Sequence, residues 1–128
     1  MKPRPGSLTV PFPPSVNNYY RQFRGRTILT RQAREYRKEA VLAAIRSGMV
    51  PFGSSHLCVT IGLYMPDRRP RDIDNACKGL LDALQHARLF DNDSQIRDLR
   101  IVHCGIDKDD PRAEVSIHEM ADELCRQA

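Results

Sequence analysis

Apolar residues alternate with other residues in four stretches of the chain, and this period of two predicts β-strands. The four stretches are residues 7–12, 56–65, 96–106 and 113–118. The alternation is cleanest from Leu57 to Met65, where every second residue is apolar. It slips near Ile101 and Val102, which predicts a bulge there. Pro11 lacks an N–H donor, so the first strand is expected to lie at a sheet edge or to end there.

Two further stretches carry apolar residues at helical spacing, and we predict α-helices over about 31–47 and about 72–87. Thr30 is a suitable N-cap for the first helix, and Gly48 suits the position just after its end. The second helix is expected to begin at Asp72. Its buried stripe follows steps of three and four residues and comprises Ile73, Ala76, Cys77, Leu80, Leu81, Leu84 and Ala87.

The segment between the first strand and the first helix is dense in turn-forming residues. Pro13 and Pro14 end any regular element, and serine and asparagine residues up to Asn18 have turn chemistry. This part is either an ordinary rigid turn or a loop that faces nucleic acid. An arginine–glycine–arginine turn at 24–26 and a brief strand at 27–29 then predict a β-hairpin.

The predicted elements follow the order β–(β-hairpin)–α–β–α–β–β, which indicates an α+β fold of mixed α/β layers. We expect a small mixed sheet packed with two main helices. At 128 residues the chain is long enough for one domain with a substantial core. Residues 1–120 are predicted to form this single domain. Residues 121–128 are predicted to be a C-terminal tail, either a short helix or a frayed end.

Composition limits the classes of function. No apolar run is long enough to cross a bilayer and the N-terminus does not resemble a secretory signal, so we expect a cytoplasmic protein without a membrane partner. The sequence has no glycine-rich phosphate-binding motif, and no small-molecule cofactor is expected. Four cysteines and four histidines are scattered along the chain, which favours structural thiols over a zinc site or a disulfide.

The net charge of +4 is distributed unevenly along the sequence. Residues 21–38 contain seven basic residues and one acid, a net charge of +6, whereas residues 107–123 contain seven acids and two bases, a net charge of −5. The basic segment is either a face for a polyanion, with the acidic segment kept away from it, or an ordinary solvated surface. Charge alone does not decide between these interpretations.

The residues best suited to chemistry lie between Met65 and Asp93. They are, in order, Arg68, Arg69, Arg71, Asp72, Asp74, Lys78 and Asp93. One interpretation makes the aspartates helix or turn caps and Lys78 a surface partner of Asp74. The other makes the aspartates ligands of a hard divalent cation, because two close anions repel unless a cation or proton lies between them. The arginines would then hold a phosphate backbone, and Lys78 would steady a phosphate or the attacking water.

Three segments carry a resemblance to a known family. They are PPSVNNYYR followed by QFRGR, then MPDRRPRDIDNACKGLLDAL, then LFDNDSQI. With these segments the chain resembles the RusA family of Holliday junction resolvases over residues 8–120. The core D-x-D-N-x-x-K with a downstream N-D-x-Q is far more specific than a lone D-x-D. The resemblance places the family's catalytic acids at Asp72, Asp74 and Asp93, and its essential lysine at Lys78.

The resemblance implies a homodimeric endodeoxyribonuclease that uses Mg²⁺, or Mn²⁺ in its place. Such an enzyme would bind four-way DNA junctions and nick strands of like polarity in symmetric pairs, during recombination and repair. The chemistry would be in-line attack of a metal-activated water on a phosphodiester. The expected DNA contacts come from two segments. The hairpin region contributes Asn18, Tyr20, Arg21, Arg24 and Arg26, and the loop that contains Arg68, Arg69 and Arg71, here called the basic loop, contributes these three arginines.

Two other functions remain open at this point. One is a non-catalytic module that binds branched DNA, in which the aspartates serve only as caps. The other is a metal nuclease that acts on another branched structure or on RNA. Asp91 is an additional acid near Asp93, and we place it outside the catalytic set because Asp93 holds the motif position. Pro70 interrupts the basic loop, so the arginine contacts with individual phosphates are not assigned.

The distance that Asp93 must cover raises a question about the site. A helix to residue 87 carries the chain about 20 Å from Asp74, at ~1.5 Å per residue. The six residues 88–93 also span about 20 Å when fully extended. We favour a site built within one chain, with residues 88–90 returning along the helix. The alternative is that Asp93 faces Asp72 and Asp74 of a partner subunit.

Overall fold

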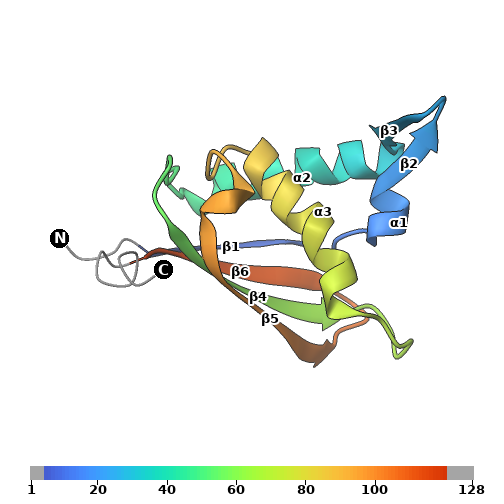
Figure 1. Ribbon diagram of the computed structural model, residues 1–128. Coiled ribbons are helices and arrows are strands. Elements are labelled where there is room, and N and C mark those ends of the chain that lie inside the picture. Colours follow the sequence, from blue (N-terminus) through green and yellow to red (C-terminus); the bar gives the residue numbers. More distant parts are fainter. Residues whose placement is uncertain (1–4, 121–128) are drawn as a thin grey trace.

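The computed structural model describes residues 5–120, and it confirms an α+β fold with a small mixed sheet (Figure 1). The strands lie in the order β1 (Pro5–Pro11), β6 (Arg112–Glu119), β4 (Leu57–Met65) and β5 (Ile96–Ile106). β4 and β5 are parallel, and the other neighbours are antiparallel. The predicted tail, residues 121–128, lies outside the described residues.

The core lies between the sheet and its two main helices, α2 (Arg31–Ser47) and α3 (Ile73–His86), which both cover one face (Figure 1). Every second residue of β4 from Leu57 to Met65 is at most 2% exposed, as the alternating pattern predicts. β1 pairs only with β6, so Pro11 lies at the end of an edge strand, where a missing N–H donor is tolerated. No helix within residues 5–120 is long and apolar enough to span a membrane.

The ends of α2 follow from single residues, as predicted. The hydroxyl of Thr30 accepts a hydrogen bond from the Ala33 amide at 3.0 Å, which satisfies one of the orphan donors of the first turn. Gly48 ends the helix in the left-handed region, with φ of 67°. α3 begins one residue later than predicted, so Asp72 is its N-cap residue.

A short helix, α1 (Val16–Tyr19), replaces the turn or loop that we expected after the prolines. Its last residue, Tyr19, is fully buried and packs against α3 at Gly79. A Cβ atom at Gly79 would lie only 2.7 Å from Cδ2 of Tyr19, so the glycine permits the close approach of the two helices. α1 therefore fixes where the following hairpin leaves the body of the protein.

The hairpin consists of β2 (Tyr20–Phe23) and β3 (Arg26–Leu29), which pair only with each other. It confirms the predicted arginine–glycine–arginine turn, and Figure 1 shows it projecting from the end of the molecule that carries α1.

The bulge predicted near residues 101–102 is wrong. The ladder between β4 and β5 is instead interrupted at Arg97 and Cys104, which have no partner on β4. β5 is an edge strand, and its Ile101 and Val102 are both half-buried on opposite faces, so two adjacent apolar residues need no bulge there.

Candidate active site

The carboxyl end of β4 leads through the loop 66–72 into α3, and this connection places Asp72 and Asp74 at the helix start. Both side chains are exposed. Although Asp72 holds the N-cap position, its side chain forms no capping hydrogen bond, and neither carboxylate has a hydrogen-bond or ion-pair partner within residues 5–120. Two exposed carboxylates two residues apart, with no hydrogen-bond or ion-pair partner, are suited to bind a hard cation. A capping role for Asp72 is not observed.

Other aspartates nearby are paired with arginines. Asp67 binds Arg71 at 2.6 Å, and Asp107 binds Arg112 at 2.8 Å. Asp82, farther along α3, accepts two hydrogen bonds from Arg37, at 2.9 and 3.0 Å. The contrast separates acids that stabilise the fold from those at the start of α3, whose oxygens remain available to a ligand.

Lys78 lies one turn along α3 from Asp74 but forms no ion pair with it within the described chain. Instead, its ammonium nitrogen lies 5.2 Å from the centroid of the Tyr20 ring, at a distance typical of a cation–π contact. The surface pair between Lys78 and Asp74, which one of the two interpretations of the sequence required, is therefore absent from the described residues. Tyr20, which we expected to contact DNA, is half-buried beneath the lysine.

The position of Tyr20 depends on a polar network beneath it. The Tyr19 and Tyr20 rings lie 4.8 Å apart, and the Tyr19 hydroxyl donates a hydrogen bond to Asp82, which Arg37 also binds. Burial, and next the Asp82 charge, raise the pKa of Tyr20 above its usual value. This network links α1, α2 and α3 and fixes the aromatic ring that Lys78 covers.

Asp93 opens a 3₁₀ turn, η1 (Asp93–Gln95), and the N-D-x-Q motif explains its geometry. Asn92, not Asp93, is the cap: its side chain accepts a hydrogen bond from the Ser94 amide, while Gln95 accepts one from the Asn92 amide. Gln95 is buried and also donates to the carbonyls of Gly53 and Ser55. The exposed Asp93 carboxylate has no partner in the described chain.

We missed the structural role of Asn92 and Gln95 in the sequence. The sequence does contain a signal for this role: Asn92 and Gln95 are three positions apart before an apolar strand, which is the spacing of a capping box.

Asp93 does not join Asp72 and Asp74 within one chain. Its amide donates to the side chain of Gln85, near the far end of α3, about 16 Å along the helix from Asp74 at ~1.5 Å per residue. Within residues 5–120, no three acidic, histidine or cysteine side chains are close enough to hold a metal ion. The site that we predicted within one chain is therefore wrong for this fold.

The connection after α3 explains this separation. Arg88 adopts a left-handed conformation, with φ of 63°, and reverses the chain just after the helix. Leu89 and Phe90 are each 1% exposed, and the Leu89 carbonyl accepts a hydrogen bond from the Phe52 amide. Leu89 and Phe90 are thus buried against the loop before β4, and the exposed Arg88 makes the turn, so residues 88–90 do not return along the helix. β5 then starts beside the start of β4, at the opposite end of the sheet from Asp72.

The basic loop is more ordered than its composition indicated. Both terminal nitrogens of Arg71 bind Asp67, at 2.6 and 3.0 Å, and the Arg71 side chain is only 24% exposed. Hydrogen bonds from Arg71 and from the Arg69 amide hold the pKa of Asp67 well below its usual range. Arg68 and Arg69 are exposed, and so are the other predicted DNA-contacting residues Asn18, Arg21, Arg24 and Arg26.

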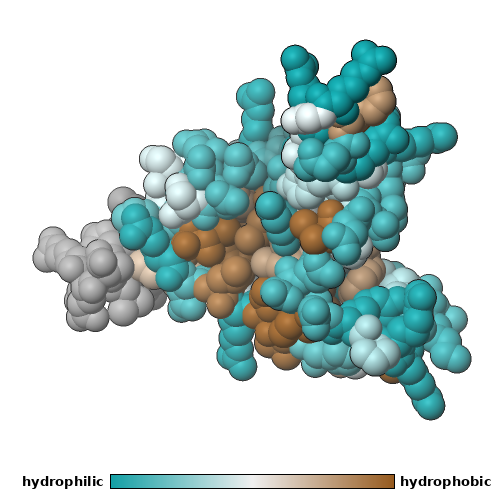
Figure 2. All heavy atoms as spheres, turned by 45° about the vertical axis from the view of Figure 1, so that its right-hand side comes forward, coloured by the Kyte–Doolittle hydropathy of each residue, from teal (hydrophilic) through white to brown (hydrophobic). Residues whose placement is uncertain are grey.

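Two hydrophilic protrusions flank a hollow on this side of the molecule. Figure 2 shows the hairpin as the upper protrusion and, below it, the region of the basic loop. A pocket of about 640 Å³ lies between α1 and the basic loop, and Asn18, Arg69 and Asp72 are among its lining residues. The acidic turn after β5 is not remote from this region, because the Asp107 amide donates to the Met65 carbonyl. Its charge is offset by Arg112.

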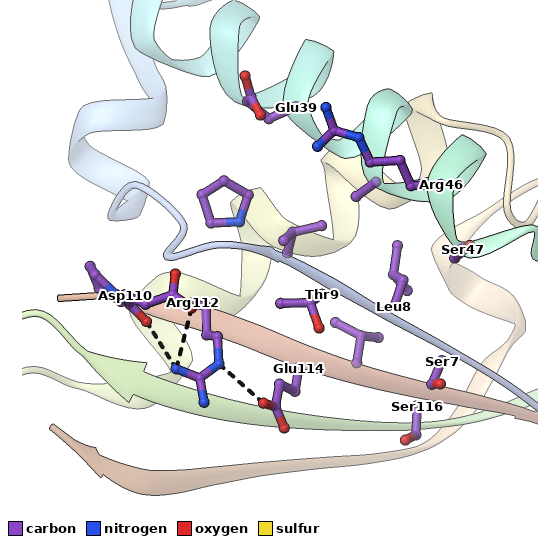
Figure 3. A pocket seen from close by; sticks show the side chains of 15 residues that line it. Ser7, Leu8, Thr9, Glu39, Arg46, Ser47, Asp110, Arg112, Glu114 and Ser116 are labelled. Carbon is purple, nitrogen blue, oxygen red and sulfur yellow. Dashed lines mark hydrogen bonds and ion pairs between the residues drawn. The ribbon is translucent and has the colours of Figure 1, made fainter. Parts of the chain in front are cut away.

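A second pocket, of about 620 Å³, lies between β1, β6 and α2 (Figure 3). At its rim Arg112 binds Asp110 and Glu114, as Figure 3 shows. None of the three candidate catalytic aspartates lines it.

Cys77 behaves as a structural thiol. It is buried on α3, and burial, with the nearby Asp74 charge, raises its pKa to about 11.

Residues 11–118 match the family model described as endodeoxyribonuclease RusA. The chain belongs to this family. Proteins named crossover junction endodeoxyribonuclease RusA from Shigella sonnei and Escherichia coli strain K12 are each 40% identical over 118 residues, which cover 91% of this chain and 97% of theirs. The protein of that name from Enterobacteria phage 82 is 39% identical over 117 residues, covering 91% and 96%. The chain is therefore an endodeoxyribonuclease, from a family of metal-dependent nucleases.

Proposed function

We propose that this RusA-family nuclease resolves four-way DNA junctions in a Mg²⁺-dependent reaction, by paired symmetric nicks in strands of like polarity. The names of its relatives support the junction as substrate. The structural observation that carries the proposal is that the exposed carboxylates of Asp72, Asp74 and Asp93 form no hydrogen bond or ion pair within residues 5–120, whereas Asp67 and Asp82 bind arginines. A non-catalytic module would not need this exposure.

The donor chemistry fits Mg²⁺ better than a softer metal. Asp72, Asp74 and Asp93 offer hard oxygen ligands, and the only described cysteine on α3, Cys77, is buried with a raised pKa. When bound, the ion supplies polarisation of the phosphodiester and activation of the attacking water; Mn²⁺ accepts the same ligands. Lys78 would donate to a phosphate oxygen and stabilise the charge that develops during in-line attack.

The homodimer completes the site in this proposal. Asp93 lies toward the far end of α3 from Asp72 and Asp74, so two copies whose α3 helices run antiparallel across a two-fold axis would bring each Asp93 to the partner's helix start. Two sites related by that axis match the symmetry of a four-way junction. The exposed arginines of the hairpin and the basic loop would hold the phosphate backbones that lead into the sites.

Cleavage assays on matched substrates test the function. A four-way junction labelled in turn on each strand should be nicked at symmetric positions with Mg²⁺ and not with EDTA. The same arm sequences assembled as duplex, flap and RNA junction serve as controls. Equal or faster cleavage of the duplex, the flap or the RNA would overturn the proposed substrate. Junction binding without any metal-dependent nicking would instead support a binding module.

A further inference from the structure

The hairpin β2–β3 is anchored at its base and free at its tip. At the base, the Thr30 amide donates to the Tyr19 carbonyl at 3.0 Å, and the Thr30 hydroxyl donates to the Asn18 carbonyl at 2.7 Å. The strands pair only with each other, from Tyr20 opposite Leu29 to Phe23 opposite Arg26. The tip therefore projects from a fixed stem, as Figure 1 shows.

The tip combines an exposed aromatic ring with positive charge. Phe23 is 52% exposed, and the Arg24 guanidinium lies 5.3 Å from the centroid of its ring. Residues 20–29 contain three arginines and no acid. Arg24 and Gly25 both have positive φ, of 51° and 75°, as in the tight turns that suit the twist of two-residue hairpins. A side-chain hydrogen bond of 2.8 Å between Gln22 and Thr27 also links the two strands.

Such a tip is chemically suited to nucleic acid whose bases are accessible. Arginines attract phosphates, and an aromatic face stacks on a base. In an intact duplex each base is already stacked on both sides, so the ring of Phe23 would find no free face. Where four arms meet, stacking is interrupted and a base face can become available. Apolar side chains that enter such steps also stabilise distorted DNA.

We infer that Phe23 stacks on a base at the branch point and makes the nuclease select junctions over duplex. The inference rests on the proposed function and adds a specificity residue to it. Tyr20, at the base of the hairpin, lies under Lys78. Phe23 is three residues farther, about 10 Å at ~3.3 Å per residue.

Binding measurements on Phe23 variants test this inference. Phe23→Ala and Phe23→Leu should lower junction affinity about 5- to 150-fold, the range for one base–aromatic stack, and leave duplex affinity and the salt dependence unchanged. Phe23→Trp should keep junction affinity. Arg21→Ala is the control for charge, since Arg21 is exposed on the same strand, and it should weaken junction and duplex binding alike. Phe23 is exposed, so these substitutions should fold normally, which thermal unfolding checks.

A fluorescent base analogue locates the contact. With 2-aminopurine placed singly along the arms, the Asp74→Asn protein should change the fluorescence near the branch point, and adding Phe23→Ala should abolish that change. Three results for Phe23→Ala would each overturn the inference. They are an unchanged affinity for the junction, an equal loss of affinity for junction and duplex, and dissociation of the homodimer in sedimentation. These outcomes differ from failure of the proposed function, in which the wild-type protein itself would not nick junctions.

Discussion

At the scale of single residues, Asp74 offers the most direct test of the chemistry. Asp74→Asn keeps the size of the side chain and removes one charge from the proposed metal site. We expect junction cleavage to be abolished, whereas junction affinity stays equal or rises because an anion facing phosphate is gone. The Asp74 carboxylate forms no hydrogen bond or ion pair within the described residues, so the free energy of unfolding should change by less than about 0.5 kcal/mol.

Asp91→Asn is the matched control for that variant. Asp91 is also an exposed aspartate, near Asp93, but lies outside the proposed catalytic set. The Asp91→Asn protein should therefore nick junctions at the wild-type rate. If Asp74→Asn also kept the wild-type rate, Asp74 would have no place in the site.

Tyr20 is predicted to position Lys78 rather than to bind DNA. Tyr20→Phe keeps the aromatic face beneath the ammonium group and should leave cleavage nearly unchanged. Tyr20→Leu removes the cation–π contact, worth about 0.5–1 kcal/mol at exposed sites, so kcat should fall about two- to fivefold. Separate measurements of the single-turnover rate and the junction Kd distinguish a positioning role of Tyr20 from a DNA contact. A raised Kd with an unchanged rate would indicate a DNA contact instead.

The sequence identifies the candidate residues but not all their physical roles. Asp72 lies at the predicted start of its helix, yet a pattern cannot tell whether the carboxylate caps the helix or points to a ligand. Asn92 and Gln95 belong to a recognisable motif. Their function in holding Asp93 depends on the carbonyls of Gly53 and Ser55, about forty residues earlier, and only the fold brings these together.

At the scale of elements, the basic loop 66–71 contains two arginines with different roles. Arg71 is largely buried by its contact with Asp67, whereas Arg69 is exposed. Arg69→Ala should weaken DNA binding and lower the slope of log affinity against log salt by about one or less. Its Tm should change little, because the ion pair of Arg69 with Asp67, at 3.3 Å, is exposed to solvent. Arg71→Ala should also lower Tm, because it leaves Asp67 without its bidentate partner. Unchanged slopes in both loop variants would mean that the loop faces away from DNA. The same salt titration of Arg26→Ala tests whether the hairpin contacts DNA.

The ion pair in this loop also has a pH dependence with a definite sign. The pKa of Asp67 is lowered in the folded protein, so the pair stabilises the loop above the ordinary carboxyl pKa. That stabilisation is lost as the pH falls toward the lowered value. Across neutral pH the loop should therefore stay ordered.

Elements defined by local signals are predictable, whereas those held by distant contacts are not. Thr30 and Gly48 mark the ends of α2, and both are confirmed. α1 has only four residues, too few for a helical period, and it is held by the packing of Tyr19 on Gly79, sixty residues away in sequence. The irregular pairing of β5 likewise depends on its neighbour β4, and its sequence suggested the wrong position.

At the scale of the whole molecule, strand pairing decides which residues can share a site. The chain length between Asp74 and Asp93 permits a return to the helix start, which is why the sequence favoured a site within one chain. The parallel pairing of β4 with β5 places the start of β5 beside Leu57, so Asp93 lies near the amino end of β4 and Asp72 follows its carboxyl end. A pairing between distant strands is not encoded in local periodicity.

A mixed dimer tests whether the partner subunit supplies Asp93. One subunit carries Asp74→Asn and the other Asp93→Asn, with different affinity tags so that the heterodimer can be purified. If each site took all its ligands from one chain, both sites would be broken. If Asp93 crosses to the partner, one site lacks two ligands and the other is complete. We expect single nicking of the junction to survive, although both homodimers are inactive.

The reciprocal mixed dimer provides the control with the same composition of mutations. It pairs a wild-type subunit with one that carries both Asp74→Asn and Asp93→Asn. A site shared across the dimer would then lack one ligand on each side, so this heterodimer should be inactive, whereas sites built within single chains would leave the wild-type subunit able to nick. Because the two heterodimers contain identical substitutions and differ only in their distribution, opposite activities would report the geometry of the site and not a general loss of stability. Activity in the reciprocal dimer, with none in the first, would refute the shared site.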